Sequence, residues 1–149
     1  MLTHALLGRV TSKTDSLQVF IDGASRGNPG PASVGVVFKD GKGKPGKTLS
    51  IPIGVATNNT AETLALIFAL QEAIIMGEKS LEVFTDSELI AKQFSGEYKI
   101  KDASLKTFAL LVKHLRQGFK HLSVTHVPRE KNKEADQAAN DALDGQTLF

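Results

Sequence analysis

The stretch Leu17-Gln-Val-Phe-Ile-Asp-Gly-Ala-Ser-Arg-Gly-Asn-Pro-Gly-Pro31 joins two kinds of local sequence. Its first part, Leu17 to Ile21, is a β-prone run and predicts a short strand that ends at Asp22. The glycines, asparagine and prolines of residues 23–31 are typical of a turn. We therefore expect an acidic side chain at the point where a strand runs into a loop.

The segments after this turn predict a meander of strands followed by helices and further strands. Residues 34–38 and 48–54 indicate two strands joined through the polar segment 39–47, so the first three strands are expected to be antiparallel. Apolar spacing then predicts helices over 60–76, 87–94, 103–116 and 132–143 and strands over 81–85 and 119–127. This order predicts an α/β fold with a five-stranded mixed sheet, antiparallel and then parallel, with helices on both faces.

Composition limits the class of protein. The chain has 149 residues, of which 41% are hydrophobic, which suits one domain with a real core. Its 18 basic and 16 acidic residues give a net charge of +2, so any nucleic-acid site must be local. Without cysteine there is no disulfide framework or thiolate metal site, and the four histidines form no cluster with ligand spacing. Carboxylates are therefore the expected metal ligands.

The N-terminal stretch, Met1 to Ser16, carries one short apolar patch, Ala5-Leu6-Leu7. That patch is too short for a signal-peptide core and far too short to span a bilayer. We expect a cytoplasmic protein with no membrane partner. The chain gives no clear sign of an obligate protein partner, and we expect a monomer.

Four carboxylates fall where the predicted elements begin or end. Asp22 ends the first strand, Glu62 opens the central helix, Asp86 ends the fourth strand and Asp136 lies in the first turns of the last helix. If the first and fourth strands are parallel neighbours, Asp22 and Asp86 leave the sheet at the same edge, which is where open sheets bind ligands.

Each acid also has a purely structural explanation. The segments 59–62 and 85–88 both match a helix N-terminal box, and Asp136 could be a solvated helix residue. Taken together, acids directed at one place would repel one another and raise their pKa values, so a cluster of this kind needs cations. Oxygen ligands of this type indicate magnesium or manganese.

Four blocks of the sequence resemble the motifs of type 1 ribonuclease H, in order and in spacing. They are Asp22-Gly-Ala-Ser-Arg-Gly-Asn-Pro-Gly-Pro31, Thr57-Asn-Asn-Thr-Ala-Glu62, Thr85-Asp-Ser87 and Val127-Pro-Arg-Glu-Lys-Asn-Lys-Glu-Ala-Asp136. The resemblance covers residues 17 to 143 and implies a ribonuclease H-like fold. It leaves residues 1–16 as an N-terminal extension and 144–149 as a C-terminal tail.

The resemblance implies an endonuclease that hydrolyses the RNA strand of RNA/DNA hybrids and leaves 5′-phosphate and 3′-hydroxyl ends. It makes the four acids (Asp22, Glu62, Asp86 and Asp136) ligands of two Mg²⁺ or Mn²⁺ ions. It also implies substrate contacts from Gly23, Asn28, Thr57, Asn58 and Asn59. The alternatives for these contacts are an ordinary turn around residues 23–31 and a helix cap at position 59.

The chain departs from many bacterial members in two places. It lacks their basic handle after the second helix and has only Gly96 to Asp102 there, with Lys99 and Lys101. The loop before the last acid is short, and it offers Arg129 in place of the histidine that assists turnover in those members. His126 lies near that position in the sequence, but its alternation places it in a strand. We expect Arg129 to assist catalysis, against the alternative of a solvated surface charge.

Three other interpretations fit the same fold. One is a hybrid-binding module that has lost catalysis, which the intact set of acids argues against. Another is a DNA nuclease or transposase-like core, which would not need the asparagine-rich blocks. The third is a ribonuclease H domain cut from a larger polyprotein, with residues 1–16 as a vestigial linker.

Overall fold

The structure, a computed structural model, describes residues 16–97 and 99–145. Most of the predicted extension (1–16) and tail (144–149) therefore lies outside the described residues. The strands are β1 (Leu17–Ser25), β2 (Gly30–Lys39), β3 (Pro45–Ala56), β4 (Ser80–Thr85) and β5 (His121–His126). The helices are α2 (Asn58–Ile75), α3 (Glu88–Ser95), α4 (Ala103–Arg116) and α5 (Lys133–Asp144), with a short 3₁₀ helix, η2 (Arg129–Lys131), before the last.

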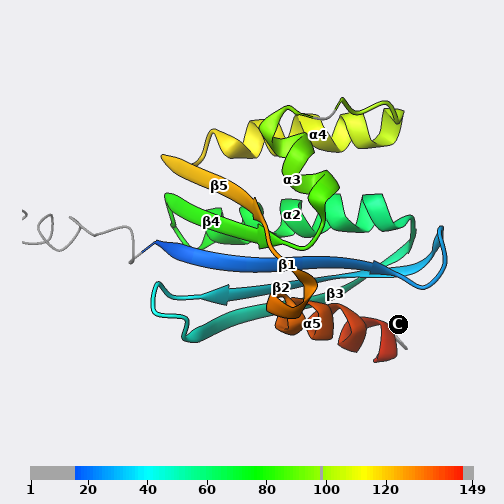
Figure 1. The fold of residues 1–149 in the computed structure, drawn as a ribbon, viewed down its shortest axis with the longest axis horizontal. Helices are drawn as coiled ribbons and strands as arrows, with labels where there is room; N and C mark the ends of the chain where they lie inside the picture. The colour runs from blue at the N-terminus through cyan, green and yellow to red at the C-terminus, as the bar shows by residue number, and fades with distance from the viewer. Residues whose placement is uncertain (1–15, 98, 146–149) are drawn as a thin grey trace, which may run out of the picture.

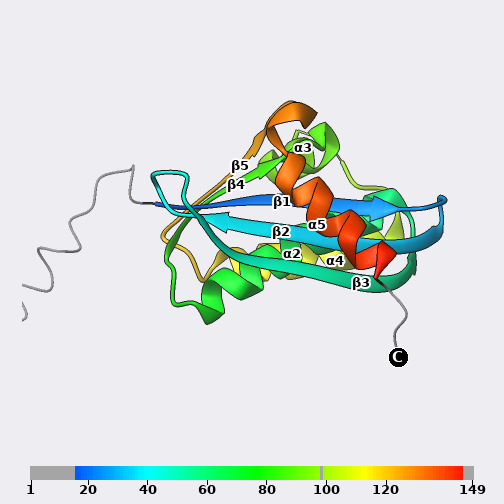
Figure 2. The ribbon, with the colours of Figure 1, turned by 90° about the horizontal axis from the view of Figure 1, so that it is seen from below.

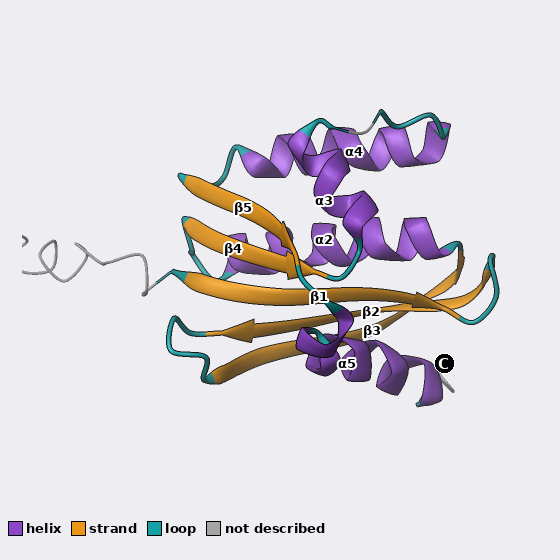
Figure 3. Cartoon of the chain, viewed as in Figure 1, coloured by secondary structure: helices purple, strands orange, loops and turns teal. Residues whose placement is uncertain are grey.

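The strands form one mixed sheet in the order β3-β2-β1-β4-β5 (Figures 1 and 3). β1 is antiparallel to β2, and β2 to β3, whereas the pairs β1–β4 and β4–β5 are parallel. The meander ends at the β3 edge, and α2 carries the chain back across the sheet so that β4 can pair beside β1. The predicted α/β fold with a five-stranded mixed sheet is confirmed.

The main core lies between the sheet and α2, and α3 and α4 pack on the same face (Figures 1 and 2). Alanines recur every fourth residue along the sheet-facing side of α2, and all of them are fully buried: Ala61, Ala65, Ala69 and Ala73. Small side chains allow the helix to approach the sheet closely, and Leu66 and Leu70 are buried beside them. α2 is therefore buried on more than one side, as its apolar sequence predicts.

The opposite face is covered by α5, which lies across β1, β2 and β3 (Figure 2). The contact is tight, because a Cβ atom added to Gly35 of β2 would lie 2.2 Å from the carbonyl oxygen of Ala135. Only a glycine permits this approach of two backbones. Gly35 thus sets the distance between the sheet and the helix that carries Asp136.

Several predicted boundaries differ from the structure, and two of them bear on the acidic residues. β1 does not end at Asp22 but runs to Ser25, and in the antiparallel register Asp22 faces Gly35 of β2. The strand continues because β2 still pairs with it on one side after the parallel pairing with β4 has ended at Ile21. The central helix begins at Asn58 and not at Thr60, since Thr57 supplies the cap.

A few large apolar side chains remain at the surface of the helices. Ile75 of α2 is 75% exposed and Leu110 of α4 is 67% exposed. None of the helices in the described ranges is both long and apolar enough to cross a membrane.

Candidate functional site

Asp22 and Asp86 lie side by side at the end of the parallel strand pair. Ile21 of β1 is paired with Thr85 of β4, and each strand places an aspartate at the next residue. Beyond Thr85 the chain turns into α3, where the Ser87 side chain accepts a hydrogen bond from the N–H of Ile90 and caps the helix. The predicted meeting of these two acids at one edge is confirmed, although Asp22 reaches it from within β1.

Glu62 reaches the same place because α2 starts directly on top of β1. A Cβ atom at Gly23 would lie 2.2 Å from the carbonyl carbon of Ala61 and 2.3 Å from the backbone nitrogen of Glu62. No other residue fits beneath the first turn of the helix. The glycine after Asp22 therefore has a packing role, which its turn-like local sequence does not predict.

Asp136 is brought in by a buried asparagine one helical turn earlier. Asn132 is 1% exposed, and its Nδ2 donates a hydrogen bond to the carbonyl oxygen of Ile21 at 2.9 Å. Its own backbone carbonyl accepts from the N–H of Asp136 at 3.1 Å. Asn132 thus ties the start of α5 to the strand residue that precedes Asp22. Asn132 belongs to the motif block of residues 127–136, but its local sequence predicts no role for it.

The carboxylates form a compact, mutually repelling group. Asp22, Glu62 and Asp86 each offer an oxygen within 4.8 Å of the other two. Burial raises the pKa of Asp22 from 3.8 to about 8, with further increases from the charge of Asp86 and from a hydrogen bond with Asp136. Burial also raises the pKa of Glu62 from 4.5 to about 6, although a hydrogen bond from Ser87 opposes the shift. Like charges held this close are the arrangement expected of ligands for a divalent cation.

These acids line an open cavity of about 550 Å³ on the surface of the protein. Its walls come from β1, α2, α5 and the loops at the ends of β4 and β5. The lining residues are Asp22, Gly23, Ala24, Ser25, Asn58, Glu62, Asp86, Arg129, Asp136 and Asn140.

The comparisons with known proteins agree with this architecture. A family model described as "Reverse transcriptase-like" matches residues 20–142. The chain is 44% identical to ribonuclease HI of Halobacterium salinarum over 86% of its own length. The crystal structure of ribonuclease H1 from that archaeon superposes with a TM-score of 0.84 over 86% of this chain and 97% of that one. The chain belongs to the type 1 ribonuclease H family. The expectation drawn from its motif blocks is confirmed.

A second solved structure, LC11-RNase H1 in complex with an RNA/DNA hybrid, is 41% identical, with a TM-score of 0.82 over 86% of this chain and 96% of that one. Several relatives are longer proteins. The chain spans 64% of the Halobacterium ribonuclease HI and, at 40% identity over 83% of its own length, 34% of a bifunctional protein from Mycobacterium tuberculosis.

Of the expected substrate residues in this ribonuclease H domain, Gly23 and Asn58 line the acidic cavity, and the other three do not. The Oδ1 of Asn28 accepts a hydrogen bond from the backbone N–H of Asn58 at 3.0 Å, so it fastens the turn after β1 to the start of α2. Thr57 caps α2 by accepting from the N–H of Thr60 at 3.2 Å. Asn59 is exposed in the first turn and is not the cap.

The structure separates the two residues proposed for the loop before Asp136. Arg129 begins η2 and lines the acidic cavity. His126 is the last residue of β5, as its alternation predicts, and is not among the lining residues. Position therefore favours Arg129 over His126 for a role in the site.

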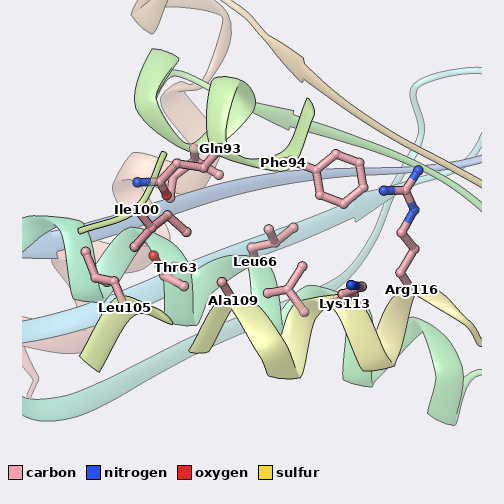
Figure 4. A pocket seen from close by; sticks show the side chains of 11 residues that line it. Thr63, Leu66, Gln93, Phe94, Ile100, Leu105, Ala109, Lys113 and Arg116 are labelled. Carbon is pink, nitrogen blue, oxygen red and sulfur yellow. The ribbon is translucent and has the colours of Figure 1, made fainter. Parts of the chain in front are cut away.

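A second cavity, of about 260 Å³, lies between α2, α3 and α4 (Figure 4). Most of its lining is apolar, with Lys113 and Arg116 on α4, and the Arg116 guanidinium lies 4.8 Å from the centre of the Phe94 ring. No carboxylate lines it. The acidic cavity is therefore the better place for metal-dependent chemistry.

Proposed function

We propose that the protein is an endoribonuclease that hydrolyses the RNA strand of RNA/DNA hybrids and leaves 5′-phosphate and 3′-hydroxyl ends. The observation that carries the proposal is the group of three carboxylates within 4.8 Å, set in an open cavity of a type 1 ribonuclease H fold. The names of the relatives support it, since one is a ribonuclease HI and another was solved with a bound hybrid. In this proposal, residues 17–143 are the catalytic domain.

The ligands for metal are Asp22, Glu62 and Asp86, with Asp136 completing the set. The donors fit a hard divalent cation, because all are carboxylate oxygens and their mutual repulsion is relieved by positive charge. Two Mg²⁺ or Mn²⁺ ions held there would activate the attacking water and stabilise the leaving 3′ oxygen.

The protein's own groups orient the substrate around these acids. Glu62 is half-buried at the cavity wall, where its carboxylate can accept a hydrogen bond from a ribose 2′-OH beside the cut. Gly23 exposes backbone in the same wall, and Asn58 adds an amide that can bond the minor groove of the hybrid. Arg129 places a guanidinium at the cavity, where it can stabilise negative charge on the phosphate.

The remaining expected contacts lie on the turn after β1 and at the start of α2. Asn28 and Asn59 are exposed there and can contact the minor groove, and Thr57 can seat a phosphate of the DNA strand. Since α3 and α4 are joined by residues 96–102 without a basic handle, Lys99 and Lys101 supply much of the positive charge beside the duplex. A recognition surface of this kind reads both a ribose strand and a DNA backbone, which only a hybrid offers together.

Cleavage of labelled duplexes tests the proposal. With Mg²⁺ or Mn²⁺ we expect the RNA strand of a hybrid to be cut and double-stranded RNA and DNA to be left intact, with EDTA abolishing the reaction. Asp86→Asn is the matched inactive control, because an amide cannot supply the charge that metal binding requires. Near-normal turnover by this variant would contradict the role of Asp86 as a metal ligand. Equal cleavage rates for the hybrid and for double-stranded DNA would favour a DNA nuclease of the same fold. Binding of the hybrid without cleavage would indicate a catalytically impaired module.

The length of ribonucleotide run refines the test. Because 2′-OH contacts are spread over several residues, a DNA duplex with a single ribonucleotide should be cut poorly and one with four or more efficiently. Efficient cutting at a lone ribonucleotide would contradict the type 1 assignment of specificity.

A further inference from the structure

The turn after β1 is attached to α5 through Arg26. The guanidinium Nη2 of Arg26 lies 2.7 Å from Oδ1 of Asp144, the last residue of α5. The same nitrogen donates to Oδ1 of Asn140, one turn earlier on the helix, at 3.4 Å. One arginine therefore holds two successive turns of α5.

Asn140 links Arg26 to Asp136. Its Nδ2 donates to the backbone carbonyl of Asp136 at 2.9 Å and lies 3.4 Å from the carboxylate Oδ1 of the same residue. The amide is held in one orientation, because Oδ1 must face the guanidinium of Arg26 and the NH₂ group must face the acceptors of Asp136. Asn140 also lines the acidic cavity.

The same turn is attached to α2 on its other side. Asn28 accepts from the N–H of Asn58, the first residue of α2, and the hydroxyl of Ser25 donates at 2.8 Å to the carbonyl of Ala56, the last residue of β3, two residues before the helix. The turn therefore bridges the helix that carries Glu62 and the helix that carries Asp136. Its position can set the separation of these two acids.

Asp136 needs such a restraint more than the other acids do. Its side chain reaches Asp22, but it is not one of the three residues whose oxygens all lie within 4.8 Å of one another, so the direction of its side chain decides whether it can share a metal ion with Glu62 and Asp86. A free aspartate on a helix surface can rotate about its side-chain bonds, and ordering it on metal binding costs affinity. A hydrogen bond from a neighbouring amide reduces that cost.

We infer that Asn140 and Arg26 are positioning residues that hold the Asp136 carboxylate toward the metal-binding acids. Stability alone does not account for the arrangement. The side chains of Arg26 and Asp144 are 48% and 64% exposed, and ion pairs this exposed contribute little to folding. The inference rests on the proposed function for its link to catalysis, but metal binding tests it separately.

Calorimetric titration with Mn²⁺ is the direct test, and it requires no catalysis. We expect Asn140→Ala to weaken Mn²⁺ binding about 10-fold, the lower end of the range for residues that orient metal ligands. Arg26→Ala should weaken it in the same direction but less. The matched control is Gln137→Ala on the exposed side of α5, which removes an amide that donates to Asp141 on the same helix and should bind Mn²⁺ as the wild type does. The melting temperatures of all variants should stay close to that of the wild type.

A double-mutant cycle shows whether the two residues act in series. If Arg26 works through Asn140, the double variant Arg26→Ala/Asn140→Ala should bind Mn²⁺ no more weakly than Asn140→Ala alone. Arg26→Lys should restore only part of the effect, because an ammonium can pair with Asp144 but lacks the planar guanidinium group that directs one nitrogen at both Asp144 and Asn140.

Kinetics on a hybrid add a second readout. The metal concentration for half-maximal rate should rise in Asn140→Ala, whereas kcat at saturating metal should change little. Wild-type Mn²⁺ binding by Asn140→Ala would overturn the inference. A higher KM for the hybrid in Arg26→Ala with unchanged Mn²⁺ binding would also overturn it, since Arg26 would then be a phosphate contact. If the wild type fails to cut hybrids but the Mn²⁺ titrations behave as expected, the proposed function fails and the positioning role stands.

Discussion

Asn132 donates a hydrogen bond from its side chain to the carbonyl oxygen of Ile21, 111 residues away in the sequence. The bond is buried, and it joins the start of α5 to the strand position next to Asp22. The other side-chain atom, Oδ1, has no hydrogen-bond partner among the described residues. The hydrogen bond from Asn132 to Ile21 therefore helps to hold Asp136 beside Asp22.

Replacing Asn132 with alanine should destabilise the protein by about 1–3 kcal/mol, because the buried carbonyl of Ile21 loses its side-chain donor. Urea unfolding with and without Mn²⁺ measures the loss, and weaker Mn²⁺ binding should accompany it. Lys133→Ala, at the exposed neighbouring position, is the control. An unchanged free energy of unfolding would show that the bond contributes nothing.

Gly23→Ala should cost at least about 1–3 kcal/mol, the range for overpacking, since the new methyl group would collide with the backbone of Ala61 and Glu62. The helix must move away from β1, so cleavage should fall together with stability. Gly46→Ala on β3 is a suitable comparison, because its Cβ would come no closer than 3.3 Å to another atom. Equal effects of the two substitutions would contradict the packing role of Gly23.

The metal-free protein should lose stability as the pH rises from about 4 to about 8. Folding raises the pKa of Asp22 from 3.8 to about 8 and that of Glu62 from 4.5 to about 6, so the folded state binds more protons than the unfolded state across this range. Urea unfolding in EDTA at a series of pH values should show the decline, and Asp22→Asn should reduce it. Mn²⁺ binding should strengthen over the same range, because the carboxylates must lose their protons to ligate metal. Constant stability from pH 4 to pH 8 would mean that folding does not raise the pKa values of Asp22 and Glu62.

Arg129→Ala should lower kcat by roughly 10-fold or more, within the range for lost electrostatic or proton-transfer assistance. His126→Ala should change little, because His126 ends β5 and does not line the acidic cavity. Steady-state cleavage of a hybrid by each variant at saturating metal measures both effects on kcat. The opposite ranking would return the assisting role to the histidine.

The element order and the four acids could be predicted from the sequence, because both depend on local patterns. Apolar spacing identifies each helix and strand. It places the end of β4 at Thr85, so Asp86 is predicted to follow the strand directly, as observed. Asp22 shows the limit of this approach. Its turn-rich continuation predicts the end of a strand, but pairing with β2 carries the strand through to Ser25.

The arrangement of the site was decided only in the tertiary structure. The local sequence of Gly23 predicts only a turn, whereas in the structure the first turn of α2 packs against it. The local sequence of Asn132 indicates only a residue before a helix, whereas in the structure its side chain bonds Ile21. Arg26 and Asn140 are 114 residues apart, and nothing local in either segment points to the other. Local sequence determines which backbone conformations and which chemical groups are available. The distances among those groups depend on how close two helices can approach one sheet, which is a property of packing between distant segments.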